Sequence, residues 1–488
     1  MARKVFISVL GATFYNECVY GEVDVNTNMV IKAYTPTRFV QQATLEYLGA
    51  HEWSGNDAAY IFTTRKAREN NWNESITEQG HYVQGKWQVD PYIGLEKVIK
   101  EMNLPFMTKN VDIPDGNGEV EMWKIFSAIF NVIQDGDELY FDLTHSFRYI
   151  PMLVLVLGNY SKFLRNVKIC SITYGNFEVS KSREDKIAPI VDLMSLTILQ
   201  DWTFAAADMI RNGNSDRLSE LSRNNYLTQM LRSKKPGKQL NVNESTAEGK
   251  IKNYISDLHE MLLNLRLCRL PQIISGGTMG KVNSSLLQAQ SQLKADNGID
   301  NGNSANANAI SIIPPILEKI KGTFNGFSPK SDINNGYLAA KWCCEHQLYQ
   351  QAITILHENI TTDICLKLGI PERIYANRDF AAYYLRENKF DNDDLKRLTK
   401  EDADKFKNKR KELSQFIAKF QCVAKWIHRK RNTYDHAAMS YEEKKNGNKV
   451  EYVEGKLTTS DIKILKDTII PYVFNPTKDK KDEILKLL

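Results

Sequence analysis

The sequence predicts an α/β domain followed by an all-α domain, and three observations lead to this prediction. Short apolar runs alternate with helical patterns up to about residue 192, which is typical of a parallel sheet covered by helices. From Leu193 onward, strand patterns nearly vanish and apolar residues recur at helical spacing. The length of 488 residues exceeds what one ordinary core accommodates, so two or three domains are expected.

Each element of the first domain has its own apolar pattern. Strands are expected at residues 5–10, 58–63, 110–113, 137–143 and 167–174, with an antiparallel addition at 186–191. Helices are expected at 37–47, 92–102, 120–133 and 150–164, and a polar loop at 65–80. This order predicts a doubly wound, Rossmann-like domain over residues 1–192, with its ligand site where strand ends meet helix starts.

The second half divides into a helical connector, residues 193–330, and an all-α domain, residues 331–488. Helices are expected at 194–210, 251–267, 337–368, 391–431 and 460–488, and a polar loop at 233–250. The stretch 275–307 is rich in Gly, Ser, Asn and Gln, which favours a flexible surface insertion with at most one short helix.

Composition limits the class of protein. A net charge of +5 permits a nucleic-acid partner without requiring one, because only a local patch would indicate it. Seven cysteines without zinc-ligand spacing favour reduced thiols, a cytoplasmic location and no metal site. The first apolar run ends at Gly11, too early for a secretory signal, and no stretch has transmembrane length, so we expect no membrane partner.

Two loops of the first domain are candidate ligand-binding segments. One contains Gly11, Ala12 and Thr13, directly after the first strand; the other follows the strand ending near Asp142 and contains the residues Thr144, His145, Ser146 and Arg148. Small and hydroxyl residues allow backbone N–H groups to approach a phosphate or sugar, and Arg148 can pair with a phosphate. The alternative is that Thr144 or Ser146 only caps the next helix. Neither loop is a dinucleotide fingerprint or a P-loop, so no coenzyme is expected.

A second candidate site lies at the end of the helix that contains Trp426. Apolar residues recur along this helix at spacings of three and four, through Leu413, Phe420 and Ile427, and the same stripe continues onto Arg431. A charged side chain in a row of buried apolar residues is unusual, because burying a charge costs free energy unless the charge is paired. Asn432 and His436 are four residues apart and lie beside it.

Three interpretations of this helix end stay open on the residues alone. Arg431 can pair with Asp435 at a solvated helix end. Alternatively, the basic residues around Trp426 can form a nucleic-acid patch. Finally, the cluster can be a metal-independent ribonuclease site, with a histidine for proton transfer and an arginine for phosphate charge, completed by a second copy across a two-fold axis. On the preceding helices, His346 and His357 are expected to be surface or hydrogen-bonded helix residues. Glu358 can support a neighbouring helix by a salt bridge and is assigned no catalytic role.

The segments Asp142–Arg148 and Arg431–His436, in this order, resemble those of the CRISPR-associated CARF–HEPN ribonucleases of type III systems, the Csx branch in particular. The sequences 339–342 and 351–358 are also similar to a helix pair of such HEPN domains. The insertion at 275–307 departs from compact relatives.

This resemblance implies a CARF domain that binds a cyclic oligoadenylate, with cyclic tetra-adenylate favoured, and a HEPN domain that then cleaves single-stranded RNA. Arg431, Asn432 and His436 would be catalytic, and the two loops would contact the activator. The protein would be a homodimer or a higher even-numbered homo-oligomer, without a cofactor or a metal. The alternative is a non-catalytic, nucleotide-sensing RNA-binding or regulatory protein that uses Arg431 as a phosphate anchor.

Overall fold

The computed structural model of the protein describes residues 2–24, 27–83, 86–145, 149–223, 246–299, 305–435, 441–446, 449–454 and 457–488. The chain forms two compact units. The first, the sheet unit, is built on the chain up to Asp201, and the second, the helical unit, begins at Trp202 inside helix α7 (Met194–Asn212). The domain limits expected from the sequence, at residues 192 and 330, stay predictions.

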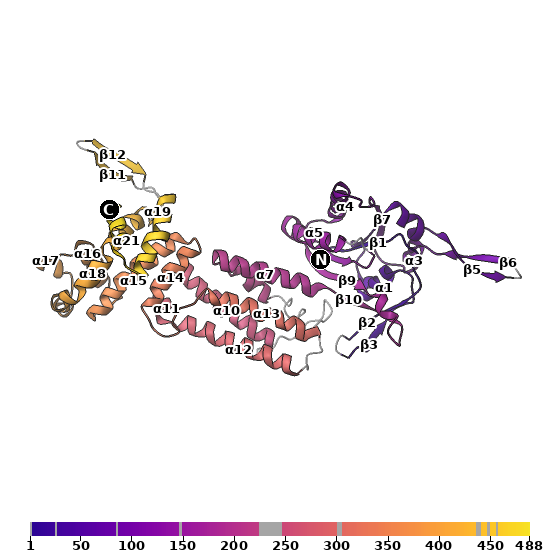
Figure 1. The fold of residues 1–488 in the computed structure, drawn as a ribbon, viewed down its shortest axis with the longest axis horizontal. Helices are drawn as coiled ribbons and strands as arrows, with labels where there is room; N and C mark the ends of the chain where they lie inside the picture. The colour runs from indigo at the N-terminus through magenta and orange to yellow at the C-terminus, as the bar shows by residue number, and fades with distance from the viewer. Residues whose placement is uncertain are drawn as a thin grey trace. The chain divides into compact units, whose positions relative to one another are not determined.

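Within the described residues, the first unit contains an eight-stranded mixed sheet in the order β3-β2-β10-β9-β8-β1-β4-β7 (Figure 1). Its strands are β1 (Lys4–Leu10), β2 (Val19–Val23), β3 (Val30–Ala33), β4 (Ala58–Thr63), β7 (Met107–Asp112), β8 (Glu138–Asp142), β9 (Lys168–Gly175) and β10 (Ile187–Asp192). The run from β9 to β7 is parallel, whereas β10 is antiparallel to β9. These strands confirm the α/β prediction, but β2 and β3 were not expected.

Helices cover both faces of the sheet (Figure 1). The first face carries α1 (Val40–Tyr47) and α3 (Leu95–Glu101), whose side chains join Phe6 and Leu10 of β1 in one buried cluster. The second face carries α4 (Glu119–Val132) and α5 (Ile150–Arg165). Helix α5 lies so close to β9 that a Cβ on Gly158 would be 2.6 Å from the Ile169 Cδ1 atom, which explains a glycine inside this helix. The three layers are those of a doubly wound fold.

The prediction of a polar loop at residues 65–80 is wrong. This stretch contains the short helices α2 (Arg65–Ala67) and η2 (Arg68–Trp72) and the start of a hairpin, β5 (Ser75–Val83) with β6 (Lys86–Tyr92). The remaining short elements of the unit are η1 (Ala50–Glu52) and α6 (Phe177–Ser180). Asn71 and Trp72 are buried and therefore fix the segment against the sheet.

The second unit is largely helical. Its helices are α8 (Asp216–Arg223), α10 (Ala247–Arg266), α11 (Leu270–Ser275), α12 (Gly277–Ile299), α13 (Ala305–Gly322), α14 (Asn334–Glu345), α15 (Tyr349–Leu368), α16 (Tyr375–Glu387), α17 (Asn392–Leu395), α18 (Lys400–Asp435), α19 (Thr459–Ile464), η3 (Leu465–Ile469), α20 (Ile470–Phe474) and α21 (Lys478–Lys486). One hairpin, β11 (Tyr441–Asn446) with β12 (Lys449–Glu454), corrects the expectation of an all-α second half. The loop expected at 233–250 falls mostly outside the described residues, and α10 begins within it.

The stretch 275–307 was expected to hold at most one short helix, and this expectation is wrong. Helix α12 occupies most of the stretch, and α13 begins at its end. Val282, Leu286, Ala289 and Leu293 of α12 are buried and recur at spacings of three and four. These four apolar positions form a helical stripe that packs into the unit, and burial of that stripe outweighs the polar composition of the remaining positions.

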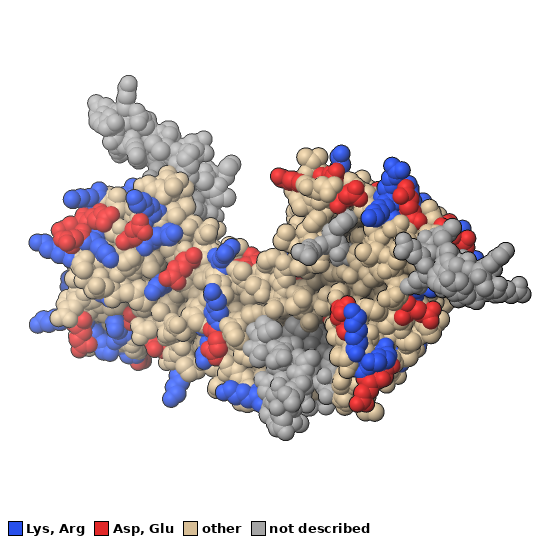
Figure 2. Space-filling view, turned by 45° about the vertical axis from the view of Figure 1, so that its right-hand side comes forward, with Lys and Arg blue, Asp and Glu red and all other residues tan. Residues whose placement is uncertain are grey.

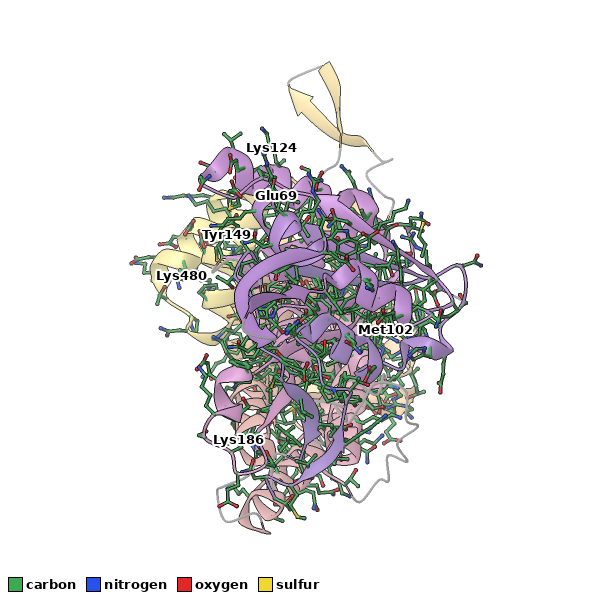
Figure 3. All side chains as sticks on the ribbon, turned by 90° about the vertical axis from the view of Figure 1, so that its right-hand side faces the viewer. Glu69, Met102, Lys124, Tyr149, Lys186 and Lys480 are labelled. Carbon is green, nitrogen blue, oxygen red and sulfur yellow. The ribbon has the colours of Figure 1, made fainter. Side chains whose placement is uncertain are left out.

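The described surface has mixed charge, and two helices of the sheet unit expose apolar side chains. On the face drawn in Figure 2, Lys and Arg alternate with Asp and Glu, and no large patch of one sign is visible on the described residues. The sheet unit exposes apolar side chains on α4 and α5. Lys124, which lies in α4, and Tyr149, which directly precedes α5, are labelled in Figure 3. Among the described residues, no helix is both long and apolar enough to span a membrane.

Candidate functional site

The two loops predicted to bind a ligand lie side by side at the carboxyl ends of β1 and β8. These strands are neighbours, and the chain reverses its winding direction around β1, so the loops lie at the topological switch point of the sheet. A Cβ on Gly11 would be 3.6 Å from the His145 carbonyl oxygen and 2.5 Å from the Tyr15 hydroxyl. The rings of Tyr15 and His145 stack with their centroids 4.0 Å apart. Glycine at position 11 therefore allows the loops to meet.

A buried polar network supports the loops from below. Asp142, at the end of β8, accepts hydrogen bonds from the hydroxyls of Ser8 (2.7 Å) and Thr144 (2.6 Å). Thr144 also accepts from the backbone N–H of Gly175 (2.8 Å), and Gln41 donates to Ser8 (3.1 Å). Burial raises the pKa of Asp142, although these hydrogen bonds oppose the rise. The Thr144 hydroxyl is thus bonded on both sides, which favours a structural role for that side chain.

Two asparagines that the sequence reasoning missed hold the first loop. The Asn71 amide donates to the carbonyl oxygens of Gly11 and Thr13 (both 2.8 Å), and Asn70 donates to the Ala12 carbonyl (2.7 Å). Both asparagines belong to the segment expected as a polar loop. The run of asparagines there was a signal, because amide side chains commonly satisfy the carbonyls of irregular backbone.

The His145 side chain in the second loop has unused hydrogen-bonding capacity. Its Nε2 atom is buried and has no hydrogen-bond partner among the described residues. Burial lowers the pKa of His145 to about 4, so the ring is neutral at physiological pH. Ser146 and Arg148 lie outside the described residues, and their roles stay predictions.

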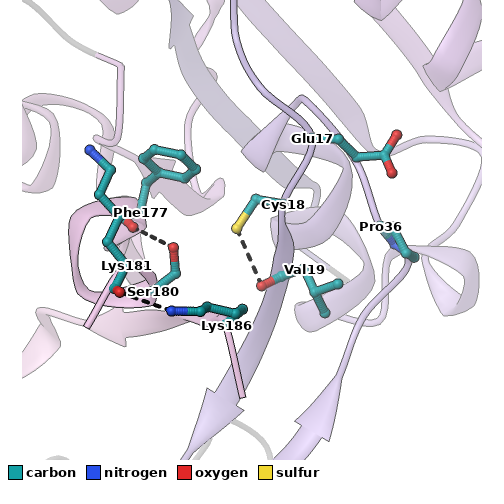
Figure 4. Close-up of a pocket in the computed structure, with 8 residues that line it drawn as sticks. All are labelled: Glu17, Cys18, Val19, Pro36, Phe177, Ser180, Lys181 and Lys186. Carbon is teal, nitrogen blue, oxygen red and sulfur yellow. Dashed lines mark hydrogen bonds between the residues drawn. The ribbon is translucent and has the colours of Figure 1, made fainter. Parts of the chain in front are cut away.

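A separate hollow of 530 Å³ lies beside the sheet unit and is lined by Glu17, Cys18, Val19, Pro36, Phe177, Ser180, Lys181 and Lys186 (Figure 4). Three of its polar side chains have partners within the chain. Lys186 donates to the Lys181 carbonyl (3.1 Å), Lys181 pairs with Glu178 (2.7 Å), and Ser180 donates to the Phe177 carbonyl (2.7 Å). None of the loop residues predicted to bind the ligand lines this hollow.

The second candidate site is centred on Arg431, near the end of α18. Leu413, Phe420 and Ile427 are buried, so the predicted apolar stripe is confirmed up to the turn before Arg431. At that turn α18 faces α15, and the Arg431 Nη1 atom lies 2.8 Å from Glu358 Oε1 and 2.9 Å from His357 Nδ1. Arg431 therefore lies on the stripe because it pairs across the helix interface within one chain. Packing of this part of the stripe against a second subunit stays a prediction.

Glu358 joins three helices. Its Oε2 atom pairs closely with the Arg378 guanidinium of α16, while Oε1 pairs with Arg431 of α18. Burial alone would raise the pKa of Glu358, but the hydrogen bonds and charges of His357 and Arg378 outweigh it and lower that pKa to about 2. The salt bridge that the sequence reasoning allowed for Glu358 is confirmed, and it involves the candidate catalytic arginine.

Other residues of the predicted helix end are placed less favourably for nucleic acid. Trp426 is buried, so it does not offer a ring to bases, and Lys430 pairs with Asp461 of α19 (3.0 Å). His428, one turn before Arg431, has its pKa lowered by burial and by the nearby Arg386, His357 and Arg431. The side chain of Asn432, the expected Asp435 pair and the whole of His436 lie outside the described residues.

Comparison with known proteins gives one clear similarity. The chain is 30% identical over 196 residues to the CRISPR-associated protein MJ1674 of Methanocaldococcus jannaschii. The match covers 35% of this chain and 30% of the relative, so the chain spans about a third of the length of the curated relative it matches. No protein-family model matches the sequence. The chain is thus similar to a CRISPR-associated protein over part of its length.

The carboxylate of Glu358 predicts an acid-dependent stability. Its pKa falls from 4.5 to about 2 on folding, so its contribution is complete above about pH 4.5 and is lost as the pH falls toward 2. Replacing Glu358 by glutamine is expected to lower the free energy of unfolding by about 2 kcal/mol at neutral pH, after allowance for solvent screening of a partly exposed pair. Near pH 2 the two proteins should have equal stability. Urea unfolding followed by circular dichroism at several pH values measures this, and a constant difference at every pH would contradict it.

Proposed function

We propose that the protein is a cyclic-oligoadenylate-activated, metal-independent endoribonuclease that cleaves single-stranded RNA in type III CRISPR antiviral defence. The observation that carries this proposal is the position of Arg431, held by Glu358 and His357 five residues before His436. The similarity to a CRISPR-associated protein supports the biological setting.

The chemistry needs few groups because RNA contains its own nucleophile. The 2′-oxygen attacks the adjacent phosphorus while a base takes its proton, the bond from phosphorus to the 5′-oxygen breaks, and an acid protonates that oxygen. The products are a 2′,3′-cyclic phosphate and a 5′-hydroxyl. His436 is assigned the proton transfer and Asn432 a polar contact, whereas Arg431 stabilises the charge that grows on the phosphate.

The switch-point loops are assigned the activator. They meet at the carboxyl ends of parallel strands, where open α/β folds bind ligands, and the buried His145 Nε2 there has no partner among the described residues. The main-chain carbonyls of Gly11, Ala12 and Thr13 are occupied by Asn70 and Asn71, so this loop is pre-organised. A pre-organised loop reduces the entropy lost on binding.

A homodimer is part of the proposal, and the face formed by α4 and α5 is its expected contact. We call this the α4–α5 face; its exposed members are Trp123, Met152, Val156, Tyr160 and Phe163. Helix α5 buries its opposite side on the sheet, so it is apolar on two sides, which is typical of a helix covered by a partner. Tyr160 also packs edge-on against Phe130 of α4 with centroids 5.2 Å apart, so the two helices present one continuous surface.

One assay tests the function. Labelled single-stranded RNA is incubated with the protein and EDTA, with and without cyclic tetra- or hexa-adenylate, beside His436→Ala. Cleavage that needs the activator, survives EDTA and disappears in the variant is the expected result. Equal cleavage by the variant would remove His436 from the site. RNA that is bound under every condition and never cut would support the non-catalytic, RNA-binding alternative.

The sensor loops have their own test. Arg148→Ala is expected to raise the activator concentration for half-maximal cleavage by about tenfold, because a charge-assisted contact to phosphate contributes on the order of 1.5 kcal/mol. Cleavage without activator should not change. Titration of activator against initial rate measures this, and an unaltered midpoint would exclude Arg148 from the ligand site.

A further inference from the structure

Phe14 presents an exposed aromatic ring next to the first candidate loop. It directly follows Thr13 after β1, and 47% of its surface is exposed. Its ring packs edge-on against the ring of Tyr92, with centroids 5.0 Å apart and an interplanar angle of 73°. An aromatic side chain that rests on a neighbour and is still half exposed offers apolar ring surface to a ligand.

Tyr92 is a rigid support for this ring. Its side chain is only 3% exposed, its hydroxyl donates to the Asn71 Oδ1 atom (2.8 Å), and the same oxygen accepts from the backbone N–H of Tyr15 (3.2 Å). Asn71 also donates to two carbonyl oxygens of the first loop. The ring against which Phe14 packs is therefore fixed by the same network that holds the loop.

Arg38 brings a guanidinium group to the same tyrosine. It lies two residues before α1, half-buried, with its Cζ atom 5.1 Å from the centroid of the Tyr92 ring. Among the residues that the structure describes, this guanidinium has no carboxylate within ion-pair distance and no hydrogen-bond acceptor. The first turn of α1 contains no acidic residue either. Since the guanidinium contacts a ring and no acceptor, its N–H donors are free for an anion.

A nucleotide has the two groups that such a pair of side chains binds. Every nucleobase has a flat face that stacks on an aromatic ring, and a phosphate matches the planar fork of a guanidinium. Phe14 and Arg38 come from different parts of the chain, and their contacts with Tyr92 bring them together. Neither residue belongs to the segments already assigned to the activator.

We infer that Phe14 and Arg38 form a nucleotide subsite of the activator site, in which Phe14 stacks on a base and Arg38 pairs with a neighbouring phosphate. This inference rests on the part of the proposed function that assigns a cyclic oligoadenylate to this end of the sheet. It does not depend on RNA cleavage.

Direct binding of the activator tests the inference. The full-length protein is titrated with cyclic tetra-adenylate in a calorimeter, without RNA. Phe14→Leu retains an apolar side chain against Tyr92 but removes the aromatic face, and we expect its Kd to rise by about tenfold. Phe14→Tyr retains the face, and its Kd should stay within about threefold of wild type.

Arg38→Gln tests the phosphate contact. We expect a Kd about tenfold higher than that of wild type and a weaker dependence of Kd on salt concentration, because one cation that pairs with phosphate is lost. A residue that only supports the fold would not change the salt dependence.

Two matched controls lie on α7. Phe204 is also 47% exposed, and Arg211 is an exposed arginine. Phe204→Leu and Arg211→Gln make the same chemical changes in the other unit and should leave both Kd and its salt dependence unchanged. Thermal unfolding of all the variants checks that each one is folded.

The outcomes separate the subsite from the proposed function. If wild type binds cyclic tetra-adenylate and either Phe14→Leu or Arg38→Gln binds it equally tightly, the paired subsite is overturned and the proposed function stands. Weaker binding by both variants, in a wild type that binds the activator but never cuts RNA, would support the subsite and contradict the ribonuclease. A wild type that binds neither cyclic tetra- nor hexa-adenylate would overturn both.

Discussion

Replacing Arg431 by alanine is expected to slow RNA cleavage at saturating activator by about 10²- to 10³-fold, the typical cost of removing a donor that stabilises transition-state charge. Arg431→Lys should recover only part of the loss, because an ammonium group lacks the planar fork that contacts Glu358 and a phosphate together. Single-turnover cleavage of a labelled RNA measures the effect independently of product release.

The control for this experiment lies on the same helix. Lys411 is exposed on α18, and 20 residues separate it from Arg431, which corresponds to about 30 Å along a helix. Lys411→Ala removes one positive charge and should leave the rate unchanged. The Arg431→Ala variant could instead bind RNA less tightly and still cut all bound RNA at the wild-type rate. That result would make Arg431 a phosphate anchor and not a catalytic group.

Introducing two carboxylates into the α4–α5 face, Val156→Glu with Phe163→Glu, is expected to convert the proposed homodimer to a monomer. Phe163 is 86% exposed and Val156 is 55% exposed in the single chain, so neither change disturbs the core of the sheet unit. Burying two charges in an apolar contact would cost several kcal/mol, enough to dissociate a dimer at micromolar concentration. The monomer should also lose RNA cleavage, because the proposed active site needs both copies.

Sedimentation velocity of the full-length protein measures this change. Leu287→Glu is the matched control, because Leu287 is an exposed apolar side chain (59%) on α12, a helix of the other unit. A double variant that remains dimeric would place the contact elsewhere. A wild-type protein that is monomeric both alone and with activator would contradict the homodimer.

Much of the fold followed from local apolar patterns. The strands β1, β4 and β8 are almost completely buried, so their sequences are continuous apolar runs bounded by polar residues. Strands β2 and β3 escaped detection because they lie toward the edge of the sheet and have partly exposed side chains. Helix α12 escaped because its composition is polar, although its four buried positions have regular helical spacing. The polar composition of this stretch predicted a loop, whereas the spacing of its apolar residues would have predicted a helix.

For the candidate site too, some features followed from the sequence and others only from the tertiary structure. The sequence by itself determined that Arg431 interrupts an apolar stripe, because a periodic pattern can be followed along one helix. It also placed the two loops at strand ends, because strand order in a doubly wound fold brings such ends to one edge. Only the tertiary structure decided that Arg431 pairs with His357 and Glu358, which are on another helix and, for His357, 74 residues away. Residue types and spacing describe one element at a time, whereas an ion pair between helices depends on which faces pack together, and that is a property of the whole core.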